Sequence, residues 1–206
     1  MNLFFKRIRK LINEKFNIRS KSKNLDETEP FKPPAHFIKQ SVINDIRKKY
    51  GYEILVETGT YLGDMVEAQK LNFKKIFSIE LGKELHENAL VRFKNDKNVY
   101  LIYGDSGKVL PQLMTEISEC AIFWLDGHYS EGVTAKGEKE CPIYEELQAI
   151  FNSTDRKHIL LIDDARLFVG KNDYPTLADL TNYIKKFRPA SKLQVKNDII
   201  QVVLIS

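Results

Sequence analysis

Short apolar runs alternate with amphipathic segments through most of this 206-residue chain, and no other feature restricts its fold as strongly. The runs are apolar at successive positions, as expected for parallel strands that are covered on both faces. Repeated strand–helix alternation predicts an α/β fold with a Rossmann-like doubly wound sheet, mostly parallel. The expected strands are Ile54–Val56, Ile76–Ile79, Val99–Tyr103, Ala121–Leu125 and Ile159–Ile162. The expected helices are Phe37–Tyr50, Asp64–Leu71, Lys83–Phe93, Lys108–Ile117, Ile143–Phe151 and Leu177–Phe187.

The C-terminal segment follows a different pattern. Two apolar runs, Leu193–Val195 and Ile199–Ile205, flank the short polar sequence Lys196-Asn197-Asp198. Asn and Asp tolerate the left-handed backbone of tight hairpin turns. The sequence therefore predicts a C-terminal antiparallel β-hairpin.

The N-terminal segment is basic and stands apart from the rest of the chain. Residues 1–19 place apolar side chains at helical spacing with lysines and arginines between them, which predicts a basic amphipathic helix. Residues 20–34 are polar and end in two prolines, as in a linker, and residues 35–206 form the main domain. The helix could lie on an anionic membrane surface or pack on the domain or a partner subunit.

The net charge of +4 is therefore a poor guide to binding partners. Residues 1–24 contain eight basic side chains and one acidic side chain, a net +7, so the remaining chain carries −3. A mildly acidic body predicts no specific nucleic-acid binding. No apolar run approaches the roughly 20 residues of a membrane span. The two cysteines fit neither a disulfide framework nor a metal knuckle, and a cytoplasmic location is expected.

Glycines and acids follow three of the expected strands. The first strand leads into Glu57-Thr58-Gly59-Thr60-Tyr61-Leu62-Gly63, the second ends at Glu80, and Asp105-Ser106 follows the third. Ligands of open α/β sheets bind beyond the carboxyl ends of the strands, where glycines allow close backbone approach and an acid can hold a ribose.

This ordered set resembles the class I methyltransferases that use S-adenosylmethionine (SAM), over roughly residues 52–205. In that family an E/D-x-G-x-x-x-G loop wraps the methionine part of SAM, the next acid binds the ribose, and the third lies by the adenine. The resemblance implies that Glu80 binds the ribose and that Asp105 and Ser106 face the adenine. The implied cofactor-binding residues are Glu57, Thr58, Gly59, Thr60, Gly63, Glu80, Asp105, Ser106 and Asp126.

Two other functional classes fit a sheet of this kind. An NAD-type oxidoreductase would use the same strand ends, but it prefers G-x-G-x-x-G, a spacing that Thr58 and Tyr61 do not supply. A non-catalytic scaffold with the SAM-binding fold would not need acids at every strand end.

The fourth and fifth strands end in Asp126-Gly127-His128 and in Asp163-Asp164. Adjacent carboxylates beside an apolar strand need a counter-charge. A divalent cation such as Mg²⁺ could supply it. Alternatively, Asp163 caps a loop and Asp164 pairs with Arg166 or a lysine.

These two segments are similar to those of the metal-dependent sugar O-methyltransferases related to macrocin O-methyltransferase. That resemblance implies that Asp126, Asp163 and Asp164 bind Mg²⁺ and that the acceptor is a hydroxyl of a sugar, a glycan precursor or another small molecule. His128 departs from the pattern, in which an acid is more familiar. It could be the general base, a metal ligand or a hydrogen-bonded loop residue, and Asp126 is a second catalytic candidate.

The long loop of residues 129–142 separates the fourth strand from its helix. Long loops in compact domains are usually functional, so a substrate lid is expected here, with Tyr129, Thr134 and Glu138 as contacts. Phe168 to Pro175 would form the opposite wall. The sequence leaves the oligomeric state open.

Overall fold

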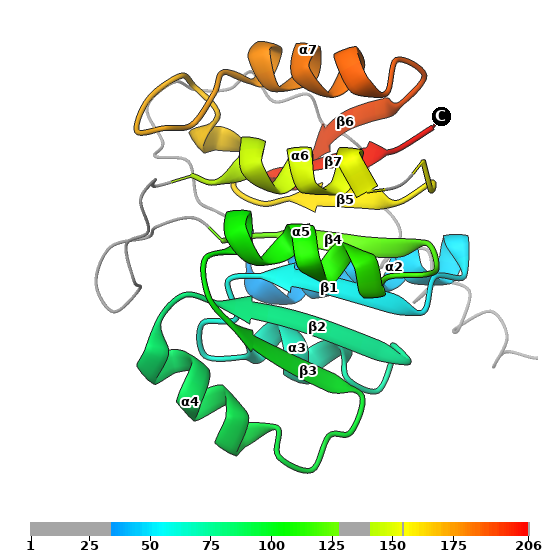
Figure 1. The fold of residues 1–206 in the computed structure, drawn as a ribbon. Coiled ribbons are helices and arrows are strands. Elements are labelled where there is room, and N and C mark those ends of the chain that lie inside the picture. The colour runs from blue at the N-terminus through cyan, green and yellow to red at the C-terminus, as the bar shows by residue number, and fades with distance from the viewer. Residues whose placement is uncertain (1–33, 128–140, 154, 206) are drawn as a thin grey trace, which may run out of the picture. The chain divides into compact units, whose positions relative to one another are not determined.

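A seven-stranded sheet forms the centre of the domain in the computed structural model, which describes residues 34–127, 141–153 and 155–205 (Figure 1). The strand order is β3-β2-β1-β4-β5-β7-β6. Strands β1 to β5 are parallel, whereas β7 is antiparallel to β5 and β6 is antiparallel to β7. The strands are β1 (Ile54–Thr58), β2 (Lys75–Glu80), β3 (Val99–Tyr103), β4 (Ala121–Leu125), β5 (Ile159–Ile162), β6 (Lys192–Lys196) and β7 (Ile199–Val203). The predicted fold class is confirmed.

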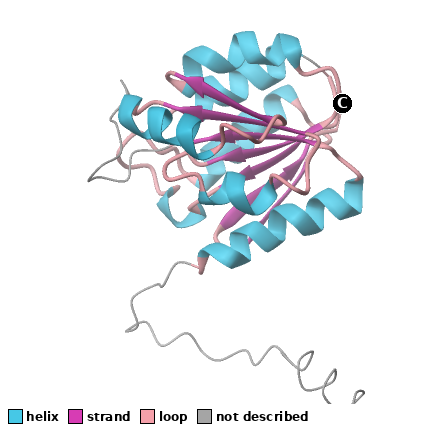
Figure 2. Ribbon diagram, turned by 90° about the horizontal axis from the view of Figure 1, so that it is seen from below, coloured by secondary structure: helices cyan, strands magenta, loops and turns pink. Residues whose placement is uncertain are grey.

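Helices cover both faces of this sheet, so the domain has three layers (Figure 2). Helices α5, α6 and α7 pack on one face, and α2, α3 and α4 pack on the other. The helices are α2 (His36–Tyr50), α3 (Asp64–Gln69), α4 (Lys83–Arg92), α5 (Ser106–Glu116), α6 (Ile143–Ser153) and α7 (Leu177–Phe187), with a 3-10 turn, η1 (Ala165–Leu167).

Alternate residues of the central strands enter the two hydrophobic cores. In β4, Phe123 and Leu125 join the core under α5, α6 and α7, whereas Ile122 and Trp124 join the core under α2, α3 and α4. All of β4 is buried, which explains its continuous apolar sequence. The large aromatic residues Phe123 and Trp124 are core residues, as expected.

Helix boundaries follow local capping residues. Helix α5 begins at Ser106, two residues before its predicted start, because the Asp105 side chain accepts a hydrogen bond from the Gly107 backbone N–H at 3.0 Å. Helix α2 ends at Tyr50 and is followed by Gly51, whose left-handed φ of 72° is typical of a glycine after a helix.

The predicted C-terminal hairpin is confirmed. Asn197 and Asp198 form a two-residue turn with φ values of 55° and 59°, both in the left-handed region. This geometry matches the type I′ turn of twisted hairpins. Lys196, predicted to be in the turn, instead pairs with Ile199 as the last residue of β6.

The described fold lies within one compact unit, Pro33–Ser206. The helix predicted at residues 1–19 and nearly all of the linker at 20–34 lie outside the described residues. None of the described helices is long and apolar enough to cross a membrane. Cys120 and Cys141 are both free thiols.

Candidate cofactor and acceptor site

The sheet register brings the predicted site residues to one edge. Thr58, the last residue of β1, lies opposite Ile79 in β2 and Leu125 in β4, and Leu125 lies opposite Ile162 in β5. Glu80 ends β2, and Asp126 and Asp163 directly follow β4 and β5, so all three lie at the same edge of the sheet. The carboxyl edge of parallel strands is where open α/β sheets bind ligands.

The loop after β1 approaches the loop after β4 closely at Gly59. Its φ is 84°, and a Cβ built there would lie 2.5 Å from the backbone oxygen of Asp126. Gly63 has the same φ, and a Cβ there would lie 2.6 Å from the Phe93 ring. Both predicted glycines are therefore required by the backbone, independently of any ligand.

Glu80 ties two backbone segments together at the end of β2. Its Oε2 accepts a hydrogen bond from the Tyr61 N–H and its Oε1 accepts one from the Gly82 N–H, both at 2.7 Å. The residue is 6% exposed. A carboxylate that is fixed by backbone amides at a strand end is a suitable acceptor for a pair of ribose hydroxyls.

Glu57 is buried at the end of β1, with a relative exposure of 1%. The Ser78 hydroxyl donates a hydrogen bond to its Oε2, and Ser78 is also hydrogen-bonded to Thr60 at 2.6 Å. Burial raises the pKa of Glu57 to about 8; the Ser78 hydrogen bond opposes this, and the charges of Asp126 and Glu80 add to it. The carboxyl is therefore largely protonated at neutral pH in the ligand-free protein.

Thr58 connects β1 to the segment after β4. Its hydroxyl accepts hydrogen bonds from the backbone N–H groups of Asp126, at 3.2 Å, and Gly127, at 3.1 Å. The negative charge of Asp126 acts on both Glu57 and Lys39. Asp126 therefore lies close enough to both Glu57 and Lys39 to influence their protonation.

Asp105 and Ser106 lie at the start of α5 and have structural contacts. Asp105 caps the helix, and the buried Ser106 hydroxyl donates a hydrogen bond to Glu146 Oε1 at 2.6 Å. Glu146 is 2% exposed and lies within reach of Gly127, because a Cβ at Gly127 would lie 3.2 Å from its Oε1. Glu146 of α6 thus lies close to both the start of α5 and the segment after β4.

The paired acids after β5 bind a lysine from α2. The Lys39 ammonium donates hydrogen bonds to Asp163 Oδ2 and, at 3.3 Å, to Asp164 Oδ1. Burial and the charge of Asp164 raise the pKa of Asp163, and Lys39 opposes both. Burial disfavours the charged form of Lys39, but Asp163, Asp164 and Asp126 outweigh it and raise its pKa.

A second cation completes this cluster. Arg166 Nη1 donates to Asp164 Oδ1 at 2.6 Å and also to Asp198 Oδ2, and Asp198 Oδ1 accepts from the Arg166 backbone N–H at 2.9 Å. Asp164 lies between the two cations, and its backbone is left-handed, with a φ of 52°. The predicted pairing of Asp164 with Arg166 or a lysine is observed, and Asp163 shares that lysine.

The predicted Mg²⁺ site does not fit this arrangement. Among the described residues, no group of three His, Cys, Asp or Glu side chains is placed to hold a metal ion, and Asp126, Asp163 and Asp164 form no such group. Asp163 Oδ1 is buried without a donor from the described chain, but one oxygen cannot replace the several that Mg²⁺ requires. The physical reason is Lys39, which supplies the counter-charge.

Two further predictions concern the acceptor side. His128 and all but the last two residues of the predicted lid lie outside the described residues. The segment Phe168 to Pro175 is described, and its Phe168 and Tyr174 side chains are buried in an edge-to-face contact at 5.4 Å. These two residues thus pack into the core. A wall role for the segment stays a prediction.

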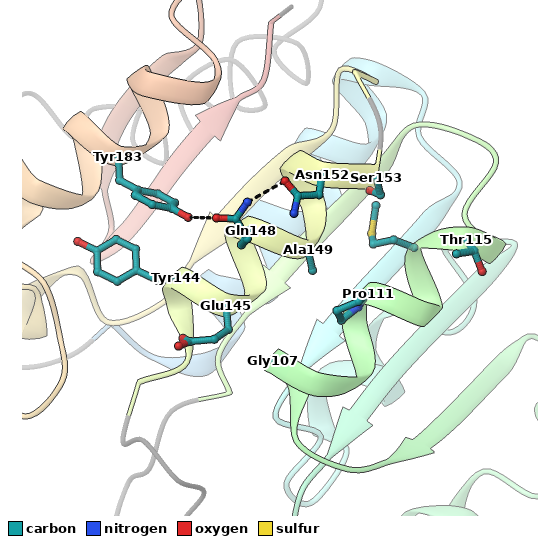
Figure 3. Close-up of a pocket in the computed structure, with 11 residues that line it drawn as sticks. Gly107, Pro111, Thr115, Tyr144, Glu145, Gln148, Ala149, Asn152, Ser153 and Tyr183 are labelled. Carbon is teal, nitrogen blue, oxygen red and sulfur yellow. Dashed lines mark hydrogen bonds between the residues drawn. The ribbon is translucent and has the colours of Figure 1, made fainter.

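A pocket of about 590 Å³ lies between α5 and α6 (Figure 3). Tyr183 of α7 borders it and donates a hydrogen bond to Gln148 at 2.8 Å. None of the predicted site residues lines it. Gly107, which follows Asp105 and Ser106, is nevertheless among its lining residues.

Sequence reasoning missed three polar residues of the site. Ser78 has a local signal, since it is a polar residue inside a strand buried on both faces. Glu146 also has one, because it shares the buried helical face of Ile143 and Ile150. Lys39 has none in its own segment, because its partners lie 124 and 125 residues away.

Solved structures supply the informative comparisons. No protein-family model and no curated protein matches the chain. The O-methyltransferase TomG from Streptomyces achromogenes, solved with SAM, is 15% identical (TM-score 0.57, 84% of this chain and 82% of TomG). An O-methyltransferase from Bacillus cereus, solved with SAH, is 11% identical (TM-score 0.58, 100% of this chain and 92% of that protein). The methyltransferase PaMTH1 from Podospora anserina, also solved with SAH, is 16% identical (TM-score 0.55, 84% of this chain and 80% of PaMTH1).

These similarities establish the fold. The antiparallel β7 between β5 and β6 also distinguishes the sheet from the dinucleotide-binding order 3-2-1-4-5-6. The chain therefore has the Rossmann-like fold of SAM-dependent methyltransferases, with the residues that its sequence assigned to cofactor binding gathered at the carboxyl edge of its sheet.

Proposed function

We propose that this chain is a SAM-dependent methyltransferase that methylates a hydroxyl group. The observation that carries the proposal is the convergence of Glu57, Glu80 and Asp126 at the carboxyl edge of a sheet of this strand order. TomG, which binds SAM, and the Bacillus cereus enzyme, which binds SAH, have the same fold and are O-methyltransferases.

The residues present fit SAM. Glu80 offers a fixed carboxylate for the ribose hydroxyls, and the loop from Glu57 to Gly63 is held beside it by the Tyr61–Glu80 hydrogen bond. The buried Glu57 carboxyl lies where the resemblance places the methionine part of SAM, whose ammonium group would favour the charged carboxylate. When bound, SAM supplies an electrophilic methyl group.

Transfer requires a new bond from the acceptor oxygen to the methyl carbon, as the carbon–sulfur bond breaks and its electron pair stays on sulfur. The acceptor hydroxyl must also lose its proton. We assign that proton to His128 or a nearby carboxylate such as Asp126, because a neutral imidazole is the commonest base near neutral pH. The protein's contribution is to hold both groups in line and exclude water.

We include no metal step, because Lys39 and Arg166 already bind the carboxylates that the sequence assigned to Mg²⁺. A sugar or glycan precursor is the proposed acceptor, on the resemblance of the segments at Asp126 and Asp163 to sugar O-methyltransferases. A fold alone does not determine an acceptor, so the acceptor class is tested directly by assay.

The test is SAH formation from SAM with three acceptor classes: free hexoses, nucleoside-diphosphate hexoses and a catechol. We expect SAH with a sugar and none with the catechol. SAH with the catechol alone would replace the proposed acceptor class. Tight SAM binding without SAH formation from any acceptor would instead favour the non-catalytic scaffold.

A further inference from the structure

Lys39 projects from α2 toward the sheet because of its helical position. Ile43, one turn later in α2, is fully buried against the core, and residues four apart in a helix share a face. The helix is held in place by Gln69, whose side-chain amide donates a hydrogen bond to the Gln40 carbonyl at 2.9 Å. Helix α2 also packs against β4. The ammonium of Lys39 is thus placed by a rigid element.

The Lys39 ammonium occupies the position that a metal bridging Asp163 and Asp164 would need. It contacts an oxygen of Asp163 and an oxygen of Asp164, and its side chain is only 13% exposed. Asp163 is 1% exposed, so its charge requires a partner within the protein. A divalent ion bridging these carboxylates would have to displace Lys39 and repel Arg166, which holds Asp164 from the other side.

We propose that Lys39 is a built-in cation that replaces a divalent metal at the Asp163–Asp164 pair, so that the acceptor side of this site is organised without metal. Lys39 is a positioning residue in this scheme: it fixes the two carboxylates beside Asp126. The inference rests on the proposed function, which makes this part of the strand edge the place where the acceptor binds. The ion-binding behaviour of the pair can be measured without methyl transfer.

The experiment titrates Mn²⁺ into the full chain by calorimetry and follows the melting temperature. Wild type is expected to show no saturable Mn²⁺ binding and no stabilisation. Lys39→Ala is expected to bind Mn²⁺ at least about tenfold more tightly than wild type, because the paired carboxylates lose their ammonium. Lys39→Ala combined with Asp163→Asn should lose that binding again, which assigns it to the pair.

Two variants serve as controls. Lys48→Ala removes an exposed lysine from the same helix and should behave like wild type. Lys39→Arg keeps the positive charge, so this variant should remain folded and show no saturable Mn²⁺ binding. If Lys39→Ala does not fold, Lys39→Gln supplies a neutral replacement that can still donate a hydrogen bond to Asp163.

The inference is overturned if wild type binds Mn²⁺ as tightly as Lys39→Ala and Asp163→Asn abolishes that binding. It is equally overturned if neither neutral variant gains Mn²⁺ binding while folded. SAM affinity, measured on the same samples, tests the proposed function separately. Wild type that binds neither Mn²⁺ nor SAM would refute the proposed function and leave Lys39 as the resident cation.

Discussion

The buried acid Glu57 should make this protein less stable as the pH rises, and Glu57→Gln should remove that dependence. Glu57 is 1% exposed, and its carboxyl accepts a hydrogen bond from Ser78. A glutamine has nearly the same shape, can accept the same hydrogen bond, and stays neutral at every pH. The substitution therefore isolates the effect of ionisation at this position.

The sign follows from proton linkage. Burial raises the pKa of Glu57 to about 8, against an ordinary value of 4.5. Between these values the unfolded chain loses the proton while the folded chain keeps it, so stability present below pH 4.5 is lost as the pH rises to 8. At about 1.4 kcal/mol per pKa unit, the full interval corresponds to at most about 5 kcal/mol. Relaxation around a buried charge reduces this, and we expect about 2–3 kcal/mol.

The assay is urea unfolding of the ligand-free wild type and variant at about pH 5 and about pH 8. The two proteins should be nearly equal at the lower pH, and Glu57→Gln should be more stable at the higher one. Glu53→Gln is the matched control, because it removes the same charge from a half-exposed acid that is paired with Lys74. A difference between wild type and Glu57→Gln that does not change with pH would refute a buried, protonated carboxyl.

Three further predictions concern the cofactor loops and the tail. Glu80→Ala should weaken SAM binding by about 1.5–3 kcal/mol in calorimetry, and an unchanged Kd with an intact circular dichroism spectrum would remove Glu80 from the site. Gly59→Ala should destabilise the fold by about 1–3 kcal/mol in urea unfolding and weaken SAM binding, because the added Cβ would clash with Asp126. Gly51→Ala is the control: the space around Gly51 is open, so SAM binding should stay intact. Residues 1–24, with their net charge of +7, should bind anionic vesicles in a salt-dependent manner. Equal sedimentation of the truncated and full chains would exclude that role, and truncation should leave SAM affinity unchanged.

The central strands were predictable because burial on both faces leaves a continuous apolar sequence. The edge strand β3 has such a sequence too, although its residues are only partly buried or exposed. The runs at Val99–Tyr103, Ala121–Leu125 and Ile159–Ile162 match the observed strands in full. The first run was predicted to stop at Val56, but β1 continues through Glu57 and Thr58. These polar residues stay in the strand because Ser78 binds the Glu57 carboxyl and Thr58 accepts two backbone N–H groups. Periodicity alone contains no information about such partners.

The charge cluster shows the same limit on the acceptor side. Arg166 follows Asp164 by two residues, so its ion pair was a predictable alternative to metal. Lys39 is one of several basic residues of α2, including Arg47, Lys48 and Lys49, and nothing local distinguishes it from the others. Only the packing of α2 against the sheet places its ammonium between Asp163 and Asp164. The sequence predicted that a counter-charge was needed but not which group supplies it.

Calorimetry with SAM, SAH and NAD on the full chain tests the central claim most directly. We predict saturable binding of SAM and SAH, weakened by Glu80→Ala, and no binding of NAD. The measurement needs no knowledge of the acceptor, and it separates the two kinds of nucleotide that sheets of this type bind. Binding of NAD, with no affinity for SAM or SAH, would contradict the assignment of this strand edge to a methyltransferase.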